Sequence, residues 1–274
     1  MRQVPHKSSS INLMQSTKLE RPQERIEFLS SALAKLLGIK KVFNEEFVNE
    51  ELCVSPFCSS LIDDVEQNAL CFQYLQIFSE ELNDELFKRL HLMVRGKSHG
   101  LHSCFLAVCH CDYAYGRGTA RRNQPPEYLR VVMAINSELF LGSDTYYDAV
   151  HVNFFLKRSS LGMHADNETI LGNQPNILSL SLGACRNFAM TNIGTGDTKE
   201  FLLGHGHIVQ MVGNLQSKYL HGVPKMQRCG DRINLTFRRI KHHRCAGTQR
   251  AHIMDTPAAP LFDLEPGRIH WYAS

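Results

Sequence analysis

Two short segments carry side chains that could hold one metal ion between them. His164 and Asp166 are separated by a single residue, so on an extended segment both side chains point to the same face. His221 is a third candidate ligand, from a segment that would form the neighbouring strand of a small barrel. Two imidazoles and one carboxylate on one side of an octahedral ion leave positions open for an oxidant and a co-substrate. This set is typical of mononuclear non-haem Fe(II) and less typical of zinc.

The run 232–238 strengthens the metal interpretation, because the His-x-Asp pattern occurs by chance and does not establish a metal site by itself. Its sequence, Arg-Ile-Asn-Leu-Thr-Phe-Arg, alternates polar and apolar residues and predicts a strand with one polar and one apolar face. The polar face carries Arg232 and Arg238, which repel each other unless an anion lies between them. A dicarboxylate would meet that need through charge-assisted hydrogen bonds worth about 1.5–3 kcal/mol each. The alternative is an exposed face that contacts solvent or nucleic-acid phosphate.

These residues resemble the AlkB-type family of 2-oxoglutarate- and Fe(II)-dependent dioxygenases, over about residues 70–240. The family carries, in order, an Asn-x-Tyr element, His-x-Asp, a Ser-x-Ser-x-Gly strand, a glycine-rich turn, a distal His and a closing Arg-x-Asn-Leu-Thr-Phe-Arg. The corresponding positions here are Asn153–Phe154–Phe155, His164–Ala165–Asp166, residues 179–186, residues 203–206, His221 and residues 232–238. Five elements in the same order make a chance match a poor explanation.

The resemblance implies a fold, a cofactor and a co-substrate. The fold would be mainly β with flanking helices, built on a double-stranded β-helix, or jelly roll. Fe(II) would be held by His164, Asp166 and His221, with 2-oxoglutarate and O2 as co-substrates. The residues expected to bind 2-oxoglutarate are Asn153, Phe155, Arg232, Asn234 and Arg238.

One position departs from the family pattern. Phe155 stands where the family has a tyrosine whose hydroxyl helps to hold 2-oxoglutarate. Loss of one neutral hydrogen bond should weaken co-substrate binding by about 0.5–1.5 kcal/mol if nothing replaces it. Binding should therefore be weaker than in the relatives without being lost.

Substrate recognition is expected from a lid before the barrel. Tyr115 is the first candidate for a ring that stacks on a flipped base, and Tyr113 is the second. The structural alternative is that both tyrosines pack the lid onto the barrel. The other candidate substrate contacts are Asn167, Glu168 and Arg186, and the basic residues Arg117, Arg121 and Arg122 are expected at the rim.

The resemblance therefore implies oxidative demethylation of N-alkylated bases in DNA or RNA, such as 1-methyladenine or 3-methylcytosine. Formaldehyde, succinate and CO2 would be released. One alternative is an oxygenase of the same fold that acts on a protein or a small molecule. Another is a non-catalytic member that binds nucleic acid or a partner, although all three metal ligands and both arginines are present.

Composition is consistent with one globular catalytic unit. Of the 274 residues, 43% are hydrophobic and 21% charged, and the formal net charge is only +3, so charge alone does not predict a nucleic-acid binder. Nine cysteines at irregular spacing, with no apolar run of membrane length and no signal-peptide core, favour a reduced intracellular compartment, nucleus or cytoplasm. We expect a monomer without a membrane partner. Cys109–His110–Cys111 suggests zinc, but because no second pair follows at finger spacing, packing or incidental thiols are the favoured interpretation.

We expect four segments along the chain. Residues 1–23 form a polar tail, in which an organelle-targeting role is conceivable, and residues 24–69 form a helical extension with apolar residues at helical spacing from Ile26 to Leu37. The dioxygenase domain covers residues 70–244, entered through a strand at 70–78 and a helix capped by Ser79, with strands dominating after about residue 99. Residues 245–274 form a C-terminal tail whose Trp271 and Tyr272 either dock or trail.

Overall fold

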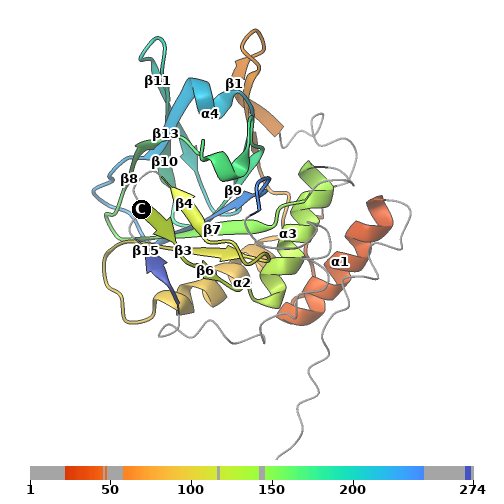
Figure 1. Cartoon of the computed structure of the whole chain (residues 1–274). Helices are drawn as coiled ribbons and strands as arrows, with labels where there is room; N and C mark the ends of the chain where they lie inside the picture. The colour runs from red at the N-terminus through yellow and green to blue at the C-terminus, as the bar shows by residue number, and fades with distance from the viewer. Residues whose placement is uncertain are drawn as a thin grey trace, which may run out of the picture.

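Two antiparallel sheets face each other and enclose the centre of the molecule (Figure 1). The computed structural model describes residues 22–45, 47, 58–115, 118–141, 146–243 and 269–272. The larger sheet has the order β1 (Cys58–Asp64), β2 (Ala69–Tyr74), β12 (Ile208–Gly213), β9 (Ile177–Gly183), β14 (Arg232–Arg238), β7 (Ala149–Leu156), β3 (Gly100–Ala107), β15 (Trp271–Tyr272). The smaller sheet has the order β11 (Thr198–Leu203), β10 (Arg186–Asn192), β13 (Tyr219–Val223), β8 (Leu161–His164). This is the jelly-roll core that was expected.

Three helices lie on the outer side of the larger sheet, and the first of them packs against the third (Figure 1). They are α1 (Pro22–Leu37), α2 (Glu80–His91) and α3 (Glu127–Phe140). Apolar side chains from these helices and from the sheet form one continuous core. That core includes Leu29, Leu33, Leu82, Leu86, Leu129, Val132, Val152, Phe154, Leu180 and Leu235. None of the helices among the described residues is both long and apolar enough to cross a membrane.

A second core fills the space between the two sheets. Phe155 and Met211 enter it from the larger sheet, and Phe188, Met190 and Val223 enter it from the smaller one. The polar face of β14 lies on this inner side, while Ile233, Leu235 and Phe237 point to the helices. Because both faces of β14 are covered, every residue of the strand is buried. The alternation in the sequence therefore predicted which side chains enter the barrel.

Two short elements complete the fold near one end of the barrel. The β4–β5 hairpin pairs Tyr113–Tyr115 with Gly118–Ala120, and β6 (Arg122–Asn123) runs parallel to β3. Single helical turns lie at α4 (Leu215–Lys218), η3 (Leu92–Val94) and η4 (Thr169–Leu171). The hairpin and α4 lie beside the strands that carry the candidate site (Figure 1).

The structure corrects the expected segments in three places. Residues 58–64, expected within a helical extension, form edge strand β1 paired with β2. Its burial pattern is weak because Ile62 is the only fully buried residue of the strand, so strand pairing and not burial defines it. The expected strand 70–78 ends at Tyr74, and Ser79 caps α2 as expected, its side chain accepting from the Leu82 amide at 3.1 Å.

The third difference is α3, a helix within the part of the chain where strands were expected to dominate. Most of its residues are buried, including the polar residues Glu127, Arg130 and Asn136, so burial extends beyond its apolar face. Trp271 and Tyr272 dock as β15 against β3. Three expected features lie outside the described residues: the N-terminal tail apart from its last two residues, most of the C-terminal tail, and Arg117.

Candidate active site

The three candidate metal ligands converge in the space between the two sheets. His164 ends β8 and is the register partner of His221 on β13, and their ring centroids are 4.4 Å apart. Asp166 follows two residues later, so its carboxylate returns to the same side. One ligand atom from each of the three residues lies within 4.8 Å of the others. Gly222 allows β13 to approach β8, since a Cβ there would lie 2.9 Å from the Leu161 carbonyl oxygen.

Hydrogen bonds outside the cluster orient the ligands. His164 Nδ1 lies 2.9 Å from the Gly162 carbonyl oxygen, which can only accept, so Nδ1 carries the proton and Nε2 keeps its lone pair. The Asp166 backbone amide donates to Gln216 Oε1 at 2.8 Å. The His164 hydrogen bond is typical of a ligating histidine, whose second ring nitrogen donates its proton to a carbonyl or carboxylate oxygen. The arrangement therefore presents basic nitrogen and oxygen atoms toward one point.

Arg238 controls the charge of the aspartate. Its Nη2 donates to Asp166 Oδ1, and both side chains are almost fully buried. Burial by itself would raise the pKa of Asp166, but Arg238 and the imidazoles of His221 and His164 outweigh burial and hold the pKa well below its usual range. Burial and the neighbouring His164 lower the pKa of His221 to about 3. At neutral pH the cluster thus presents a carboxylate and a neutral imidazole, the forms that bind metal.

The shift at His221 predicts a pH dependence of stability in the metal-free protein. The folded pKa of about 3 lies below the unfolded value of about 6.5. The unfolded chain therefore binds the proton first, and the free energy of unfolding decreases as pH falls below about 6.5. In His221→Gln this contribution is absent. Between about pH 6 and 4, the free energy of unfolding of this variant should therefore fall less steeply with decreasing pH, by up to about 1.4 kcal/mol per pH unit. Urea unfolding of both proteins at several pH values measures it, and parallel curves would contradict the assignment.

A second charged group lies deeper in the cavity. Arg232 is 2% exposed, and its Nη2 donates to Ser181 Oγ and Asn234 Oδ1, both at 2.8 Å. Its Nε and Nη1 are buried and have no hydrogen-bond partner within the described residues, and no carboxylate there pairs with it. Burial and the nearby Arg186 lower the pKa of Arg232 to about 9. A buried guanidinium with open donors is a site for an anion.

The cavity between these groups has the lining that a dicarboxylate and a metal require. Asp166 Oδ2 is buried without a hydrogen-bond partner among the described residues, and it lies 3.8 Å from His221 Nε2, so a cation between them would satisfy it. Arg232 would take the far carboxylate of the anion. The side chains present therefore fit both groups. The lining includes all eight residues expected to bind metal and co-substrate: Asn153, Phe155, His164, Asp166, His221, Arg232, Asn234 and Arg238.

Phe155 packs its ring where the family has a tyrosine. The ring centroid lies 5.1 Å from Arg232 Cζ and 5.9 Å from Arg186 Cζ, so the ring lies against both guanidinium groups. Such cation–π contacts contribute about 0.5–2 kcal/mol. Phe155 therefore holds Arg232 in place even though it cannot hydrogen-bond to the co-substrate.

Restoring the hydroxyl should strengthen co-substrate binding. Phe155→Tyr adds one donor at the cavity wall while keeping the ring, so the Kd for 2-oxoglutarate should fall by up to about tenfold, the equivalent of about 0.5–1.5 kcal/mol. Anaerobic calorimetry with Mn²⁺ in place of iron measures it. Phe154→Tyr, on the opposite face of β7, is the matched control and should bring no gain. Weaker binding by Phe155→Tyr would show that the ring environment has no room for the oxygen.

None of the five expected substrate contacts lines the cavity. Tyr113 is buried, with its ring 4.4 Å from that of His151 and 5.4 Å from Arg238 Cζ. Tyr115 is half-buried and packs against Tyr272, with ring centroids 5.6 Å apart. Both tyrosines therefore pack the hairpin onto the barrel, the structural alternative given above.

The remaining candidate substrate contacts also lie outside the cavity lining. Asn167 is exposed, and Glu168 precedes η4 and faces Tyr113. Arg186 is fully buried and donates to the carbonyl oxygens of Ser159 at 3.1 Å, Gly230 at 2.9 Å, and Lys157. Its guanidinium thus joins the β7–β8 and β13–β14 turns and does not reach the cavity. Arg121 is exposed, and Arg122 Nε donates to the Ala107 carbonyl oxygen at 3.0 Å.

Sequence reasoning missed two residues that support the site. His151 is buried behind Arg238 and pairs its Nδ1 with the Tyr272 hydroxyl at 3.0 Å. It shares its parity on β7 with Asn153 and Phe155, a signal that was available. Gln216, which holds the Asp166 backbone, comes from the short helix α4, and no pattern in the sequence links the two.

Comparison with known proteins agrees with this geometry. A sequence model of the 2OG-Fe(II) oxygenase superfamily matches residues 75–238. The alpha-ketoglutarate-dependent dioxygenase alkB homolog 3 of Rattus norvegicus is 32% identical over 139 residues, which cover 47% of this chain and 46% of the relative. The human protein of that name is 30% identical over 139 residues, covering 47% and 48%.

Two further matches carry related names. The DNA oxidative demethylase ALKBH2 of Arabidopsis thaliana is 34% identical over 101 residues, covering 28% of this chain and 32% of the relative. The solved structure of OsALKBH1 matches with a TM-score of 0.44 and 18% identity, covering 62% of this chain and 96% of that one.

The matches determine the family and leave the specificity open. The chain spans about half the length of the alkB homolog 3 proteins it matches. The superfamily match covers more than half of this chain and includes all eight residues that line the metal and anion ends of the cavity. Oxygenases of this superfamily use Fe(II), 2-oxoglutarate and O2. The chain belongs to the 2-oxoglutarate- and Fe(II)-dependent oxygenase superfamily, as an AlkB-type member.

Proposed function

We propose that this oxygenase removes N-linked methyl groups from bases of DNA or RNA. The observation that supports this function best is a pair of basic turns next to the Arg232 end of the cavity. Lys157 and Arg158 lie in the β7–β8 turn, and Lys225 and Arg228 lie between β13 and β14, all four exposed. The names of the relatives, one of them a DNA demethylase, point to the same substrate class.

The two turns connect directly to the cavity wall. The β7–β8 turn lies between the lining residues Phe155 and Leu161, and the second turn lies between Val223 and Arg232. The Lys157 amide donates to Asp231 Oδ1 at 2.9 Å, which holds the two turns together. Four exposed cations on two joined turns form a surface suited to phosphates, which position a nucleic acid without reading its sequence.

Different residues of the cavity would bind the metal and the co-substrate. His164, Asp166 and His221 would hold Fe(II), and Arg232 would receive the distal carboxylate of 2-oxoglutarate. When bound, Fe(II) with 2-oxoglutarate and O2 supplies the oxidising power that hydroxylates the N-methyl group, and formaldehyde, succinate and CO2 are released. Arg238 keeps Asp166 ionised and in position.

Apolar side chains complete the wall. Leu161, Phe188, Met211 and Val223 line the cavity beside the charged groups. They exclude water from the reacting centre, which strengthens the charge interactions and protects the oxidant from side reactions.

Product release from defined substrates tests the proposal. Formaldehyde should form from single- or double-stranded oligonucleotides of DNA or RNA that carry 1-methyladenine or 3-methylcytosine, and not from unmethylated ones. Lys225→Ala/Arg228→Ala should raise KM and reduce its dependence on salt, since two phosphate contacts are lost. Lys35→Ala/Lys40→Ala, which removes two exposed cations near the outer helix α1, is the matched control and should behave as the unchanged protein.

The opposite result is equally informative. If slow conversion of 2-oxoglutarate to succinate proceeds without substrate while no methylated oligonucleotide yields formaldehyde, the oxygenase acts on a protein or a small molecule. If neither reaction occurs with Fe(II) bound, the chain is a non-catalytic member of the family.

A further inference from the structure

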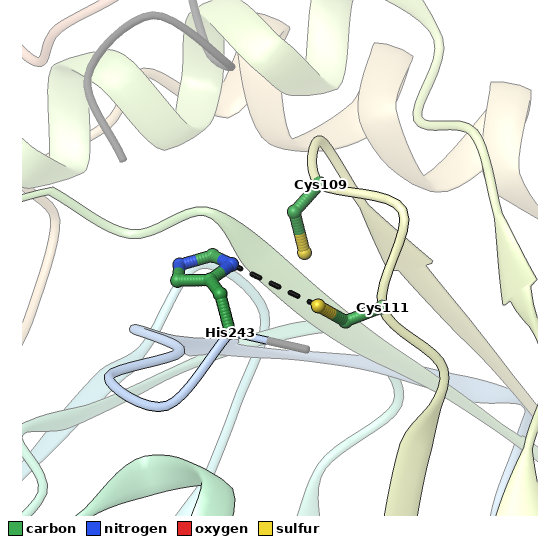
Figure 2. Close-up of side chains that lie close together, drawn as sticks. All are labelled: Cys109, Cys111 and His243. Atoms are coloured by element: carbon green, nitrogen blue, oxygen red, sulfur yellow. Dashed lines mark hydrogen bonds between the residues drawn. The ribbon is translucent and has the colours of Figure 1, made fainter. Parts of the chain in front are cut away.

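A second group of metal-binding side chains lies outside the oxygenase cavity (Figure 2). Cys109 and Cys111 belong to the segment between β3 and β4, and His243 follows the end of β14. In Figure 2 both sulfur atoms and one imidazole nitrogen point into the same space. None of these residues lines the cavity that holds His164, Asp166 and His221.

The distances agree with a tetrahedral ion. The two Sγ atoms and one ring nitrogen of His243 all lie within 4.8 Å of one another, and Cys111 Sγ is 3.8 Å from His243 Nδ1. Bond lengths of about 2.3 Å for Zn–S and about 2.0–2.1 Å for Zn–N place two tetrahedral ligands about 3.6 Å apart. Only a small contraction would bring these atoms into coordination distance.

The environment of the histidine resembles that of a ligating imidazole. His243 Nε2, on the side of the ring away from Cys111, lies 3.2 Å from Asp148 Oδ2. The other oxygen of Asp148 accepts from the Ile240 amide at 2.8 Å, which fixes the carboxylate. A carboxylate on the far nitrogen orients a metal-binding imidazole and increases its basicity.

Burial favours a structural role. Cys109 is 0% exposed, Cys111 is 3% exposed, and the His243 side chain is 8% exposed. Two thiolates and one imidazole select a borderline-soft ion, whereas the His/Asp site contains no sulfur and suits iron. The two sites therefore differ in metal preference as well as in position.

We propose that Cys109, Cys111 and His243 bind one Zn²⁺ ion as a structural site, with Asp148 orienting His243. Three protein ligands leave the fourth tetrahedral position to a water or another donor. The ion would join the segment that leads into Tyr113 to the segment that leaves Arg238. Since Tyr113 packs against Arg238, the zinc site would fix the base of the β4–β5 hairpin beside the oxygenase cavity.

Cobalt spectroscopy tests the site in the full, unaltered chain. Co²⁺ bound to thiolates gives an intense sulfur-to-metal charge-transfer band in the near ultraviolet, which nitrogen and oxygen ligands cannot produce. We expect this band to saturate at one equivalent in the intact protein and in His164→Ala, which disrupts the iron site. A protein that binds Co²⁺ without the band would overturn the proposal.

Zinc content and thermal stability give an independent readout. In the His164→Ala background about one equivalent of Zn²⁺ should remain after gel filtration and should raise the Tm. Adding Cys109→Ser/Cys111→Ser should remove both effects, whereas Cys71→Ser, a fully buried thiol elsewhere, should keep both. Asp148→Asn should weaken zinc binding by about 10–100-fold. Equal zinc retention by the double serine variant would refute the site, and because the cobalt test needs no cysteine variant, misfolding of that variant cannot obscure the result.

Discussion

His164→Ala should abolish 2-oxoglutarate turnover and reduce Fe(II) affinity by more than the roughly 10–100-fold that follows loss of a group merely orienting a ligand. The expected loss is large because one of three protein ligands disappears while the other two cannot change position. His164 is the most suitable of the three for this test because it is only half-buried, so its removal should disturb the core least. Anaerobic calorimetry measures Fe(II) affinity, and succinate formation measures turnover.

The matched control is another histidine outside the cluster. His99 is exposed and does not line the cavity, so His99→Ala should retain both iron affinity and turnover. Near-normal turnover by His164→Ala would exclude this residue as a ligand. Circular dichroism of both variants checks that the fold is unchanged.

Arg232→Met should remove most of the affinity for 2-oxoglutarate while leaving Fe(II) binding intact. Methionine keeps much of the buried side-chain volume but offers no donor to a carboxylate. Leaving a buried carboxylate without its cation costs about 3–5 kcal/mol, so Kd should rise by about 10²–10⁴-fold. Calorimetry with Mn²⁺ in place of iron gives the value without turnover.

The same substitution has a second expected effect, on stability. Without a bound anion Arg232 is a buried cation whose Nε and Nη1 lack hydrogen-bond partners within the described residues, so Arg232→Met should leave the Tm of the free protein unchanged or higher. The rise in Tm that 2-oxoglutarate produces in the unchanged protein should disappear. Arg121→Ala, which removes an exposed arginine, is the control and should keep the full rise. A large fall in Tm with normal binding would make Arg232 a structural residue only.

Local pattern predicted much of the cavity. The i, i+2 spacing of His164 and Asp166 and the alternation along 232–238 both follow from the two-residue period of a strand, which assigns each side chain to a face without knowledge of the rest of the fold. The order of the family motifs added His221, Asn153 and Phe155, and all of them line the cavity.

Tertiary structure decided what each of these side chains contacts. Arg232 and Arg238 look equivalent in the sequence, yet Arg238 pairs with the carboxylate of Asp166, whereas no carboxylate among the described residues pairs with Arg232. Arg186 appeared suited to a substrate and instead binds carbonyl oxygens of two turns. The difference depends on which strands become neighbours, and strand neighbours in a jelly roll lie far apart in the chain.

Contacts between distant segments also determine two secondary-structure elements and the second metal site. Strand β1 exists because β2 offers an edge, and α3 buries polar residues as well as apolar ones because it is covered on most sides. Cys109 and Cys111 have no partner pair at zinc-finger spacing, and the third ligand, His243, comes from beyond the last barrel strand. Short-range periodicity determined the faces of the strands, whereas contacts between distant segments, which only the closed barrel creates, determined charge pairing and the grouping of ligands.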